Sequence, residues 1–382
     1  MRIRRSLGAV ALGCVALLIA AGGTDALAQP AAAPVAAADT GDEDTSTDTS
    51  PDLTPTSPGT LLEAPLVTGA GTRNLDARAA GQGPSAPASR QSGDRAKRPY
   101  FKQADWLWDA IPADPVLDPD STAIGAALGT GVQVANLKAF ATTLRTVGKN
   151  SDIPRYDVDF KYTGEWGDDP FGDARPPIPI NTPLPTGTDK HLAIMDKATG
   201  MTFNMWMAKP TKTGWKAGWG AMAPIDGDGR ETMGGSSTGS GLARFGAVVR
   251  ATEITDGEIP HALFFSTDMA TPTVLRYPAV KTDGSNDSGS PITLPEGSRV
   301  QLDPSIDLAA IPGITPFELT VGRALQRYGA YCGDNGGARM AFIFEYVPKL
   351  KPYKRAGADG DYYNMPHLPW DKLRVLRQYD GG

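Results

Sequence analysis

Two side chains that can exchange protons, Glu253 and His261, lie close together in the sequence on either side of Gly257. The residues before Glu253 have apolar side chains at helical spacing, and those after His261 form an apolar run typical of a strand. Histidine titrates near neutral pH, and a neighbouring carboxylate can orient its ring. We therefore predict acid–base chemistry here, with His261 as the general base or acid and Glu253 as its partner. The alternative is structural: a hydrogen-bonded histidine, and a glutamate paired with Arg244 or Arg250.

His191 and Asp334 are the other candidates for catalysis. His191 begins a short apolar run, so it could act with His261 or be a hydrogen-bonded structural residue. Asp334 lies in a glycine-rich segment after a predicted strand, where it could belong to an acid/base pair or to an Asx turn. No H-x-x-x-H, H-x-H or C-x-x-C spacing provides a full set of zinc ligands, so the sequence predicts no metal and no other cofactor.

Four residues are candidates for substrate binding. Arg299 opens a predicted strand and could hold a carboxylate, such as that of an acidic sugar, in a bidentate ion pair. An ordinary inter-strand ion pair is the alternative for this arginine. Trp206, Trp215 and Trp219 lie close together beside a Gly- and Lys-rich hairpin, and exposed indoles can stack on sugar rings. Because core tryptophans are common, we expect one or two of the three to be buried.

Two local motifs suggest further chemistry. Gly235–Gly239 matches the G-x-S-x-G pattern of serine hydrolases, but the residues before it are not the apolar strand that a nucleophile elbow requires. Asp226–Gly229 resembles a calcium-binding loop, although Ser237 stands at the position of the bidentate glutamate of an EF-hand. A calcium site of another kind in this loop is an open alternative.

The first quarter of the chain has the composition of export and linker segments. Residues 1–28 combine basic residues, an apolar run and small residues before a cleavage site, which predicts a signal peptide. Residues 29–98 are mainly Ala, Pro, Thr, Ser, Gly and Asp and bury too little apolar surface to fold, so we predict a disordered linker. No later segment has the roughly 20 apolar residues of a membrane-spanning helix. We therefore expect a secreted, extracellular protein with no membrane span in the mature chain.

Residues 99–382 are expected to form one globular domain, in which residues 99–167 could be a small N-terminal subdomain. Short apolar runs separated by Gly and Pro predict strands at 191–196, 201–207, 262–266, 274–278, 299–302, 329–332 and 340–347. Two amphipathic helices are predicted, one from Leu242 to near Glu253 and one from a capping box at Thr315 to Gly329. The predicted fold class is mainly β, a β-sandwich or jelly-roll-like domain with two helices.

Charge and cysteine content limit the partners and the covalent structure. The chain has 37 Lys and Arg, a formal net charge of −6 and no basic stripe, so nucleic acid is not an expected partner. Cys14 lies in the predicted signal peptide, which leaves Cys332 as the one cysteine of the mature chain. An intramolecular disulfide is then excluded, and the core must supply the stability. We expect a monomer.

Several motifs occur in a recognisable order, among them Gly257–Leu263 (GEIPHAL), Ala324–Gly329 (ALQRYG) and Trp370–Leu376 (WDKLRVL). On these motifs the chain, from Gly187 to its C-terminus, resembles a family of exported, uncharacterised bacterial proteins of the actinobacterial type. The resemblance implies no activity. Relatives in this family often have Glu before the tryptophan of the aromatic strand, where this chain has Asn204 and Met205. A catalytic carboxylate is therefore not expected at that place.

Together these features predict a secreted protein that acts on or binds polysaccharide, such as a cell-wall glycan. As an enzyme it would be a hydrolase or lyase with His261, Glu253, His191 and Asp334 in one cleft and Arg299 holding an anionic sugar. The alternatives are a non-catalytic cell-envelope or adhesion module that binds through tryptophans, and a metal-dependent hydrolase. Side chains gathered in an open cleft would favour the enzyme, whereas buried side chains with backbone partners would favour the binding module.

Overall fold

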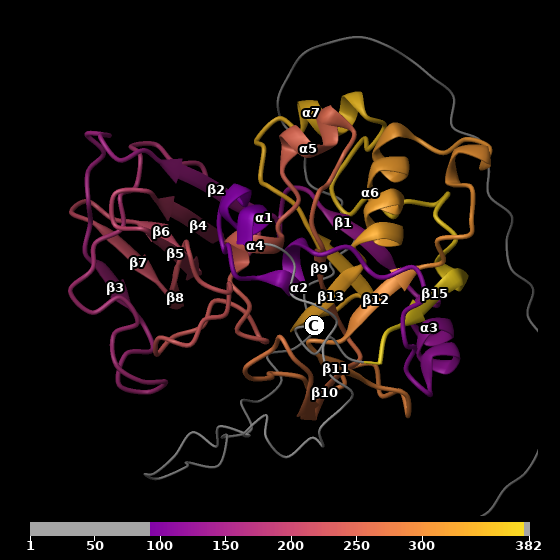
Figure 1. Cartoon of the computed structure of the whole chain (residues 1–382). Helices are drawn as coiled ribbons and strands as arrows, with labels where there is room; N and C mark the ends of the chain where they lie inside the picture. The colour runs from indigo at the N-terminus through magenta and orange to yellow at the C-terminus, as the bar shows by residue number, and fades with distance from the viewer. Residues whose placement is uncertain (1–91, 378–382) are drawn as a thin grey trace, which may run out of the picture. The chain divides into compact units, whose positions relative to one another are not determined.

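A computed structural model describes residues 92–377, which contain more strand than helix (Figure 1). The predicted signal peptide, most of the predicted linker and residues 378–382 lie outside the described residues. The prediction of a β-rich chain is confirmed: the strands form several sheets, accompanied by short helices. No helix in the described part of the chain is both long and apolar enough to cross a membrane.

The largest sheet has six strands in the order β1-β14-β9-β13-β12-β15. Their bounds are Gln133–Asn136 (β1), Met340–Ile343 (β14), Leu263–Thr267 (β9), Ala330–Asn335 (β13), Arg299–Leu302 (β12) and Leu373–Val375 (β15). β1 pairs with β14 and β9 pairs with β13 in parallel, whereas the other neighbours are antiparallel. Alternate residues of the central strands face opposite sides: Phe265 belongs to one core cluster, and Phe264 to another. Burial on both faces explains the continuous apolar runs of these strands.

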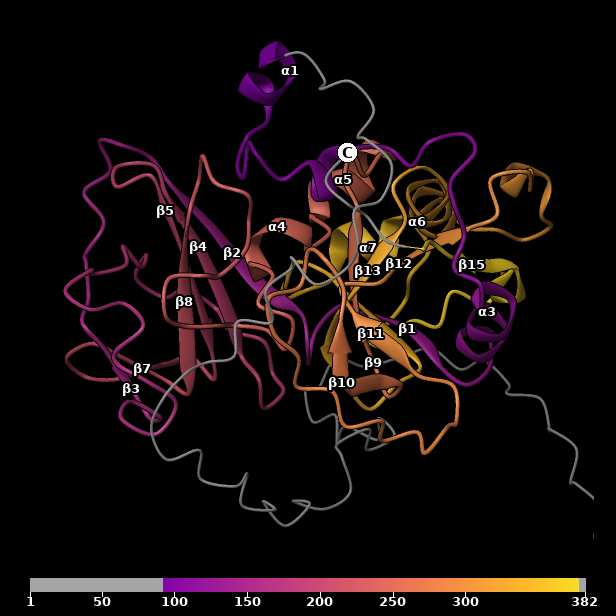
Figure 2. The ribbon, with the colours of Figure 1, turned by 60° about the horizontal axis from the view of Figure 1, so that its bottom comes forward.

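Helix α6 (Pro316–Arg327) covers one face of this sheet (Figures 1 and 2). Phe317, Val321 and Leu325 repeat at helical spacing and pack into the same core cluster as Phe265. The helix begins with the predicted capping box, since Thr315 Oγ1 accepts the Glu318 N–H at 3.2 Å and Glu318 Oε2 accepts the Thr315 N–H at 2.9 Å. This helix was fully predictable because all of its signals are local.

Replacing Thr315 with alanine removes the side-chain acceptor for the Glu318 N–H. We expect the free energy of unfolding to fall by about 1 kcal/mol, the usual cost of a lost N-cap. Urea unfolding measures this change. Ser305→Ala is the control, since the Ser305 hydroxyl is exposed and bonds only to Asp303 within its own turn. A loss for Thr315→Ala no larger than that of the control would contradict a stabilising cap.

A second group of strands forms two smaller sheets (Figures 1 and 2). The four-stranded sheet, in the order β2-β4-β5-β8, comprises Thr142–Val147, His191–Asp196, Met201–Trp206 and Trp219–Pro224. The three-stranded sheet, in the order β3-β7-β6, comprises Val158–Phe160, Trp215–Ala217 and Lys209–Pro210. Phe160 of β3, Ile194 of β4, Phe203 of β5 and Trp215 of β7 share one core cluster, so the two sheets pack on each other.

A further core cluster links the four-stranded and six-stranded sheets. It contains Met195 of β4, Phe264 of β9 and Trp106, which lies in α2 (Asp105–Trp108). Trp106 is fully buried, donates its Nε1–H to the Asp228 carbonyl at 2.7 Å and meets Tyr331 edge-to-face at 5.3 Å. Residues between 99 and 167 contribute to this cluster and to both of the others.

The predicted helix from Leu242 to Glu253 is wrong in one respect, because it is two short helices, α4 (Arg244–Ala247) and α5 (Ala251–Asp256). Between them Val249 is extended: its N–H donates to the Ile343 carbonyl and its carbonyl accepts the Glu345 N–H. Hydrogen bonds to a distant strand therefore outweigh the helical spacing of the apolar residues.

The remaining elements are α1 (Ser92–Lys97), α3 (Ser121–Gly129), β10 (Ala270–Leu275), β11 (Leu294–Glu296), η2 (Leu308–Ala310), α7 (Lys351–Arg355) and η3 (Trp370–Lys372).

Candidate functional sites

The structure brings Glu253 and His261 together, but inside the protein. The His261 side chain is fully buried, and its Nε2 lies 3.2 Å from Glu253 Oε1 and 3.3 Å from Arg250 Nη1. Its Nδ1 lies 2.8 Å from the Ala262 carbonyl oxygen, which can only accept, so Nδ1–H is the donor. Both ring nitrogens therefore have partners in the protein.

Glu253 also has a structural task. Its Oε2 accepts the Arg250 N–H at 2.7 Å, which caps the start of α5. Burial alone would raise the pKa of Glu253, but the neighbouring His261 and Arg250 outweigh this effect and lower it. The Glu253 carboxylate thus stays ionised and joins the beginning of α5 to His261, which lies two residues before β9.

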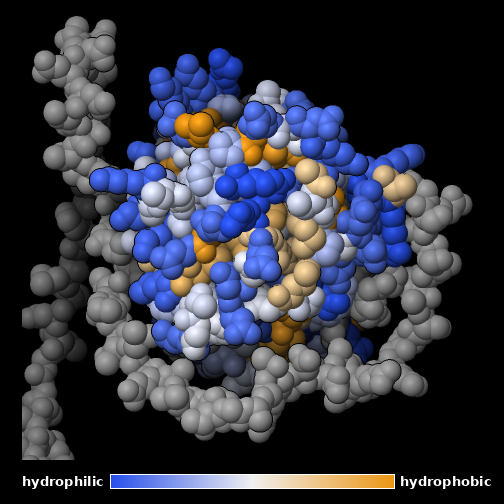
Figure 3. All heavy atoms as spheres, turned by 90° about the vertical axis from the view of Figure 1, so that its left-hand side faces the viewer, coloured by the Kyte–Doolittle hydropathy of each residue, from blue (hydrophilic) through white to orange (hydrophobic). Residues whose placement is uncertain are grey.

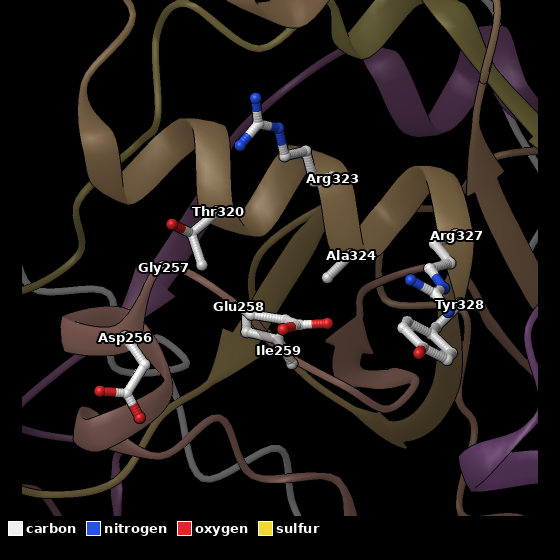
Figure 4. Close-up of a pocket in the computed structure, with 9 residues that line it drawn as sticks. All are labelled: Asp256, Gly257, Glu258, Ile259, Thr320, Arg323, Ala324, Arg327 and Tyr328. Carbon is white, nitrogen blue, oxygen red and sulfur yellow. The ribbon is translucent and has the colours of Figure 1, made fainter.

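A pocket of about 330 Å³ lies beside this connection, between the turn after α5 and helix α6 (Figure 4). Arg323 and Arg327 line it from α6, and Asp256 and Glu258 line it from the turn; in Figure 4 the guanidinium of Arg327 points toward Glu258, whereas that of Arg323 points away from the turn. All four side chains belong to exposed residues. Neither His261 nor Glu253 lines the pocket, so the proton-exchanging pair does not face this opening.

His191 and Asp334 meet through a third residue, Arg244. Arg244 Nη2 donates to His191 Nε2 at 2.5 Å and to Asp334 Oδ2 at 3.2 Å. Burial, followed by the Arg244 guanidinium, holds the pKa of His191 well below its usual value, so the imidazole is neutral at pH 7. Burial, followed by the nearby charge of Asp283, raises the pKa of Asp334 to about 7. Among the described residues, no side-chain hydrogen bond or ion pair joins His191, Arg244 or Asp334 directly to His261 or Glu253.

Arg299 lies in β12 and is buried. Its Nε donates to the Tyr328 carbonyl at 2.9 Å and its Nη2 to the Asp109 carbonyl at 2.7 Å. The guanidinium also lies 5.2 Å from the centre of the Tyr331 ring. The side chain that was expected to hold a sugar carboxylate therefore connects a strand, a helix end and the N-terminal segment.

The three clustered tryptophans differ in exposure. Trp215 and Trp219 are 8% and 6% exposed and belong to the core between the two smaller sheets, so two of the three are buried, as expected. Trp206 is half-buried at the end of β5, and its Nε1–H donates to Asp189 Oδ1 at 3.2 Å. Its ring lies over Gly218, where a Cβ atom would come within 2.7 Å of the indole.

Trp206 belongs to a group of near-parallel rings, the aromatic platform, which consists of Tyr162, Trp166 and Trp206. Tyr162 and Trp166 stack with ring centroids 4.0 Å apart and planes 8° from parallel. The Trp206 ring lies 6.2 Å from Tyr162 and 6.1 Å from Trp166, tilted by 17° from each. Trp166 is 52% exposed, although indoles are usually largely buried. The aromatic platform thus leaves about half of the Trp166 residue open to solvent.

A tight turn holds the aromatic platform in place. The Trp166 N–H donates to the Tyr162 carbonyl at 2.9 Å, which places one ring over the other, and Gly164 adopts a φ of 83° that favours glycine. Lys161 Nζ donates to Tyr162 Oη at 2.9 Å. Figure 3, which faces the side of β3 and β7, shows hydrophobic residues in small areas separated by hydrophilic ones. Trp166 and Tyr162 were not among the residues predicted from the sequence, although a tryptophan beside glycines and acidic residues is a signal for an exposed ring.

The G-x-S-x-G motif has no catalytic surroundings. Ser237 is buried, and its hydroxyl donates to Glu231 Oε1 at 2.6 Å, while its N–H donates to Glu231 Oε2 at 2.6 Å. The Ser237 hydroxyl is therefore bonded to a buried glutamate.

Asp228 of the calcium-like loop also has a partner in the protein, because its two carboxylate oxygens accept the Arg230 N–H and side-chain Nε–H.

Burial raises the pKa of Glu231 from 4.5 to about 7. The folded protein then binds this proton more tightly than the unfolded chain, so stability is lost as the pH rises from 4.5 to 7. We expect Glu231→Gln to remove about 3 kcal/mol of this pH dependence, at 1.36 kcal/mol per pKa unit. Urea unfolding at both pH values measures it, with exposed Glu258→Gln as the control. Equal pH dependence in Glu231→Gln and the wild type would contradict the shifted pKa.

Comparison with protein-family models found no match, and comparisons with curated proteins and with solved structures found none either. The resemblance to exported bacterial proteins stays a prediction. The geometry of the described residues is therefore the basis for a function.

Proposed function

We propose that this protein binds polysaccharide outside the cell without cleaving it, and that the aromatic platform is the binding surface. The proposal is carried by one observation: Trp166, a residue that is 52% exposed, stacks its ring on Tyr162 with the ring centroids 4.0 Å apart. A pyranose ring has an apolar face of C–H groups, which an exposed indole can cover. Because the turn and the stacked tyrosine already hold the indole, binding would cost little ordering entropy.

Polar groups around the aromatic platform support a sugar rather than an apolar ligand. Lys161, Glu165, Asp168 and Lys209 are exposed close to it in the chain or in the sheet. Ammonium and carboxylate groups can bind sugar hydroxyls while the indole covers the ring face. This combination of apolar surface and a few polar groups is typical of sites that bind small polar ligands.

The surroundings of the two histidines support binding over catalysis. His261 is buried between Glu253, Arg250 and a backbone carbonyl, and neutral His191 accepts from a buried arginine. A general base needs a path to a substrate proton within about 3 Å, directly or through one water. Neither imidazole lines the pocket beside α6.

The proposal includes the export of the protein from the cell and a sandwich arrangement of its sheets. The sequence pattern of residues 1–28 supports export, and the composition of residues 29–91 supports a linker that holds the domain away from the envelope. The linker expected to reach residue 98 is corrected at its end, because Ser92–Lys97 form α1 and Arg98 is buried and paired with Asp105. Met195 of the four-stranded sheet and Phe264 of the six-stranded sheet lie in one core cluster, which supports the sandwich arrangement expected from the sequence.

The proposal is tested by incubating the purified mature chain with insoluble cellulose, chitin and peptidoglycan, and with soluble xylan and glucans in affinity gels. Released reducing ends are measured in the same samples. We expect at least one polysaccharide to bind without release of product. Product release would support the enzymatic alternative, and the absence of binding to every glycan would overturn the proposal.

A further inference from the structure

Three carboxylates from separate segments converge at one place. Asp283 lies between β10 and β11, Glu296 ends β11, and Asp334 lies in β13. One oxygen of each lies within 4.8 Å of the others. Asp283 is exposed, Asp334 is partly buried and Glu296 is fully buried, so the group extends from the surface into the protein.

Glu296 is unusual for a buried acid. Its exposed fraction is 0%, and neither carboxylate oxygen has a hydrogen-bond partner among the described residues. An ionised carboxylate without a partner costs several kcal/mol to bury, so such groups normally pair or coordinate a metal. Both oxygens are therefore available as ligands, and at least one faces Asp283 and Asp334.

Gly239 borders the same place and leaves room beside the carboxylates. A Cβ atom at this position would lie 2.1 Å from Asp283 Oδ1 and 2.6 Å from Glu296 Oε1. The Gly239 N–H donates to Asp334 Oδ1 at 2.8 Å and so fixes the direction of that carboxylate. A larger residue would occupy the space among the three acids.

The charges in this place are out of balance. The guanidinium of Arg244 contacts Asp334 Oδ2, but Arg244 is one positive charge against three carboxylates. The three carboxylates lie close enough to repel one another when they are ionised. A bound cation would relieve this repulsion; a shared proton would be the competing solution.

We propose that Asp283, Glu296 and Asp334 bind a hard divalent cation, and that Ca²⁺ is the preferred ion. Carboxylate oxygens are typical ligands of Ca²⁺, Mg²⁺ and Mn²⁺, whereas zinc sites normally include histidine or cysteine. Ca²⁺ lies about 2.3–2.6 Å from its ligands, so oxygens on opposite sides of it are roughly 4.8 Å apart. The three carboxylate oxygens lie within 4.8 Å of one another, so one ion could contact all three, and water would complete the coordination.

The ion would fasten the exposed segment between β10 and β11 to the six-stranded sheet. Asp283 belongs to that segment and already accepts the Asn335 N–H at 3.2 Å, while Asp334 belongs to β13. Binding by the folded chain alone raises its stability by mass action. The role is therefore structural and does not depend on the proposed sugar binding.

The proposal is tested by calorimetric titration of the metal-free mature chain with CaCl₂, MgCl₂ or MnCl₂ alone. We expect Ca²⁺ to bind with a Kd of about 10⁻⁴ to 10⁻³ M, typical of extracellular sites, and to raise the melting temperature by several degrees. Glu296→Gln is expected to weaken Ca²⁺ binding at least 30-fold. Asp283→Asn, at an exposed position that the fold tolerates, is expected to weaken it at least 10-fold.

The matched control is Asp226→Asn, in the calcium-like loop, where the carboxylate is exposed and paired with Lys102. This variant is expected to bind Ca²⁺ like the wild type. Loss of binding in Asp226→Asn would place the ion in that loop and overturn the proposal. Wild-type Ca²⁺ affinity in Asp283→Asn, or no Ca²⁺ binding by the wild type at several millimolar, would overturn it too and would favour a shared proton.

Discussion

Replacing Trp166 with alanine is expected to weaken binding of the polysaccharide about 30-fold, because the variant loses the exposed indole of the aromatic platform. The estimate corresponds to about 2 kcal/mol, the usual effect of a central aromatic residue in a binding surface. The fold should persist, since more than half of the residue is exposed and it contributes little core. Calorimetric titration or affinity gels with the glycan selected by the binding screen measure the change.

Two further variants separate stacking from general surface effects. Trp166→Phe keeps a flat ring over Tyr162 and should retain affinity within about 5-fold of the wild type, since only part of the stacking area is lost. Ile180→Ala removes another exposed apolar side chain, 72% exposed, and should bind normally. Equal affinities of Trp166→Ala and the wild type would exclude the aromatic platform as the binding surface.

Replacing His261 with alanine is expected to lower the free energy of unfolding by about 3 kcal/mol and to leave glycan affinity unchanged. The variant leaves a cavity beside Trp108, with which the imidazole makes an edge-to-face contact at 5.9 Å, and removes a partner of the partly buried Glu253. Urea unfolding and glycan titration measure the two effects. This outcome differs from the one that the sequence favoured, in which His261 was a general acid or base.

Glu258→Ala is the control for His261→Ala. Glu258 lies in the same turn but is exposed at the edge of the pocket, so its loss should change stability by less than about 0.5 kcal/mol. A His261→Ala variant that is as stable as the wild type would show that the imidazole is not a structural residue. If this variant also failed to bind or cleave glycan, the result would support His261 as a general acid or base.

Elements with local signals could be predicted from the sequence. Strand β4, Arg299–Leu302 and helix α6 lie where the apolar periodicity and the capping box put them. The break between α4 and α5 could not be predicted, because it depends on Val249 pairing with Phe344 far away in the sequence. Short helices carry too few hydrogen bonds of their own to resist such pairing.

The candidate sites were harder to predict for the same reason. The proximity of Glu253 and His261 follows from a single turn, but their surroundings include Trp108, which contacts His261, and Tyr100, which contacts Arg250, and both come from the N-terminal segment. Glu296 gave no signal in the sequence, since its importance arises only when Asp283 and Asp334 come near it. Residue types indicate possible chemistry, and tertiary contacts decide which groups remain open to a ligand.

Whether Trp166 contacts the glycan can be measured by fluorine NMR of 5-fluorotryptophan-labelled protein. The chain has seven tryptophans, and Trp166→Phe identifies the resonance of Trp166 by its disappearance. Titration with the bound glycan is expected to shift the Trp166 resonance, while that of fully buried Trp106 stays in place. A Trp166 resonance that does not move while the glycan binds would show that Trp166 does not contact the glycan.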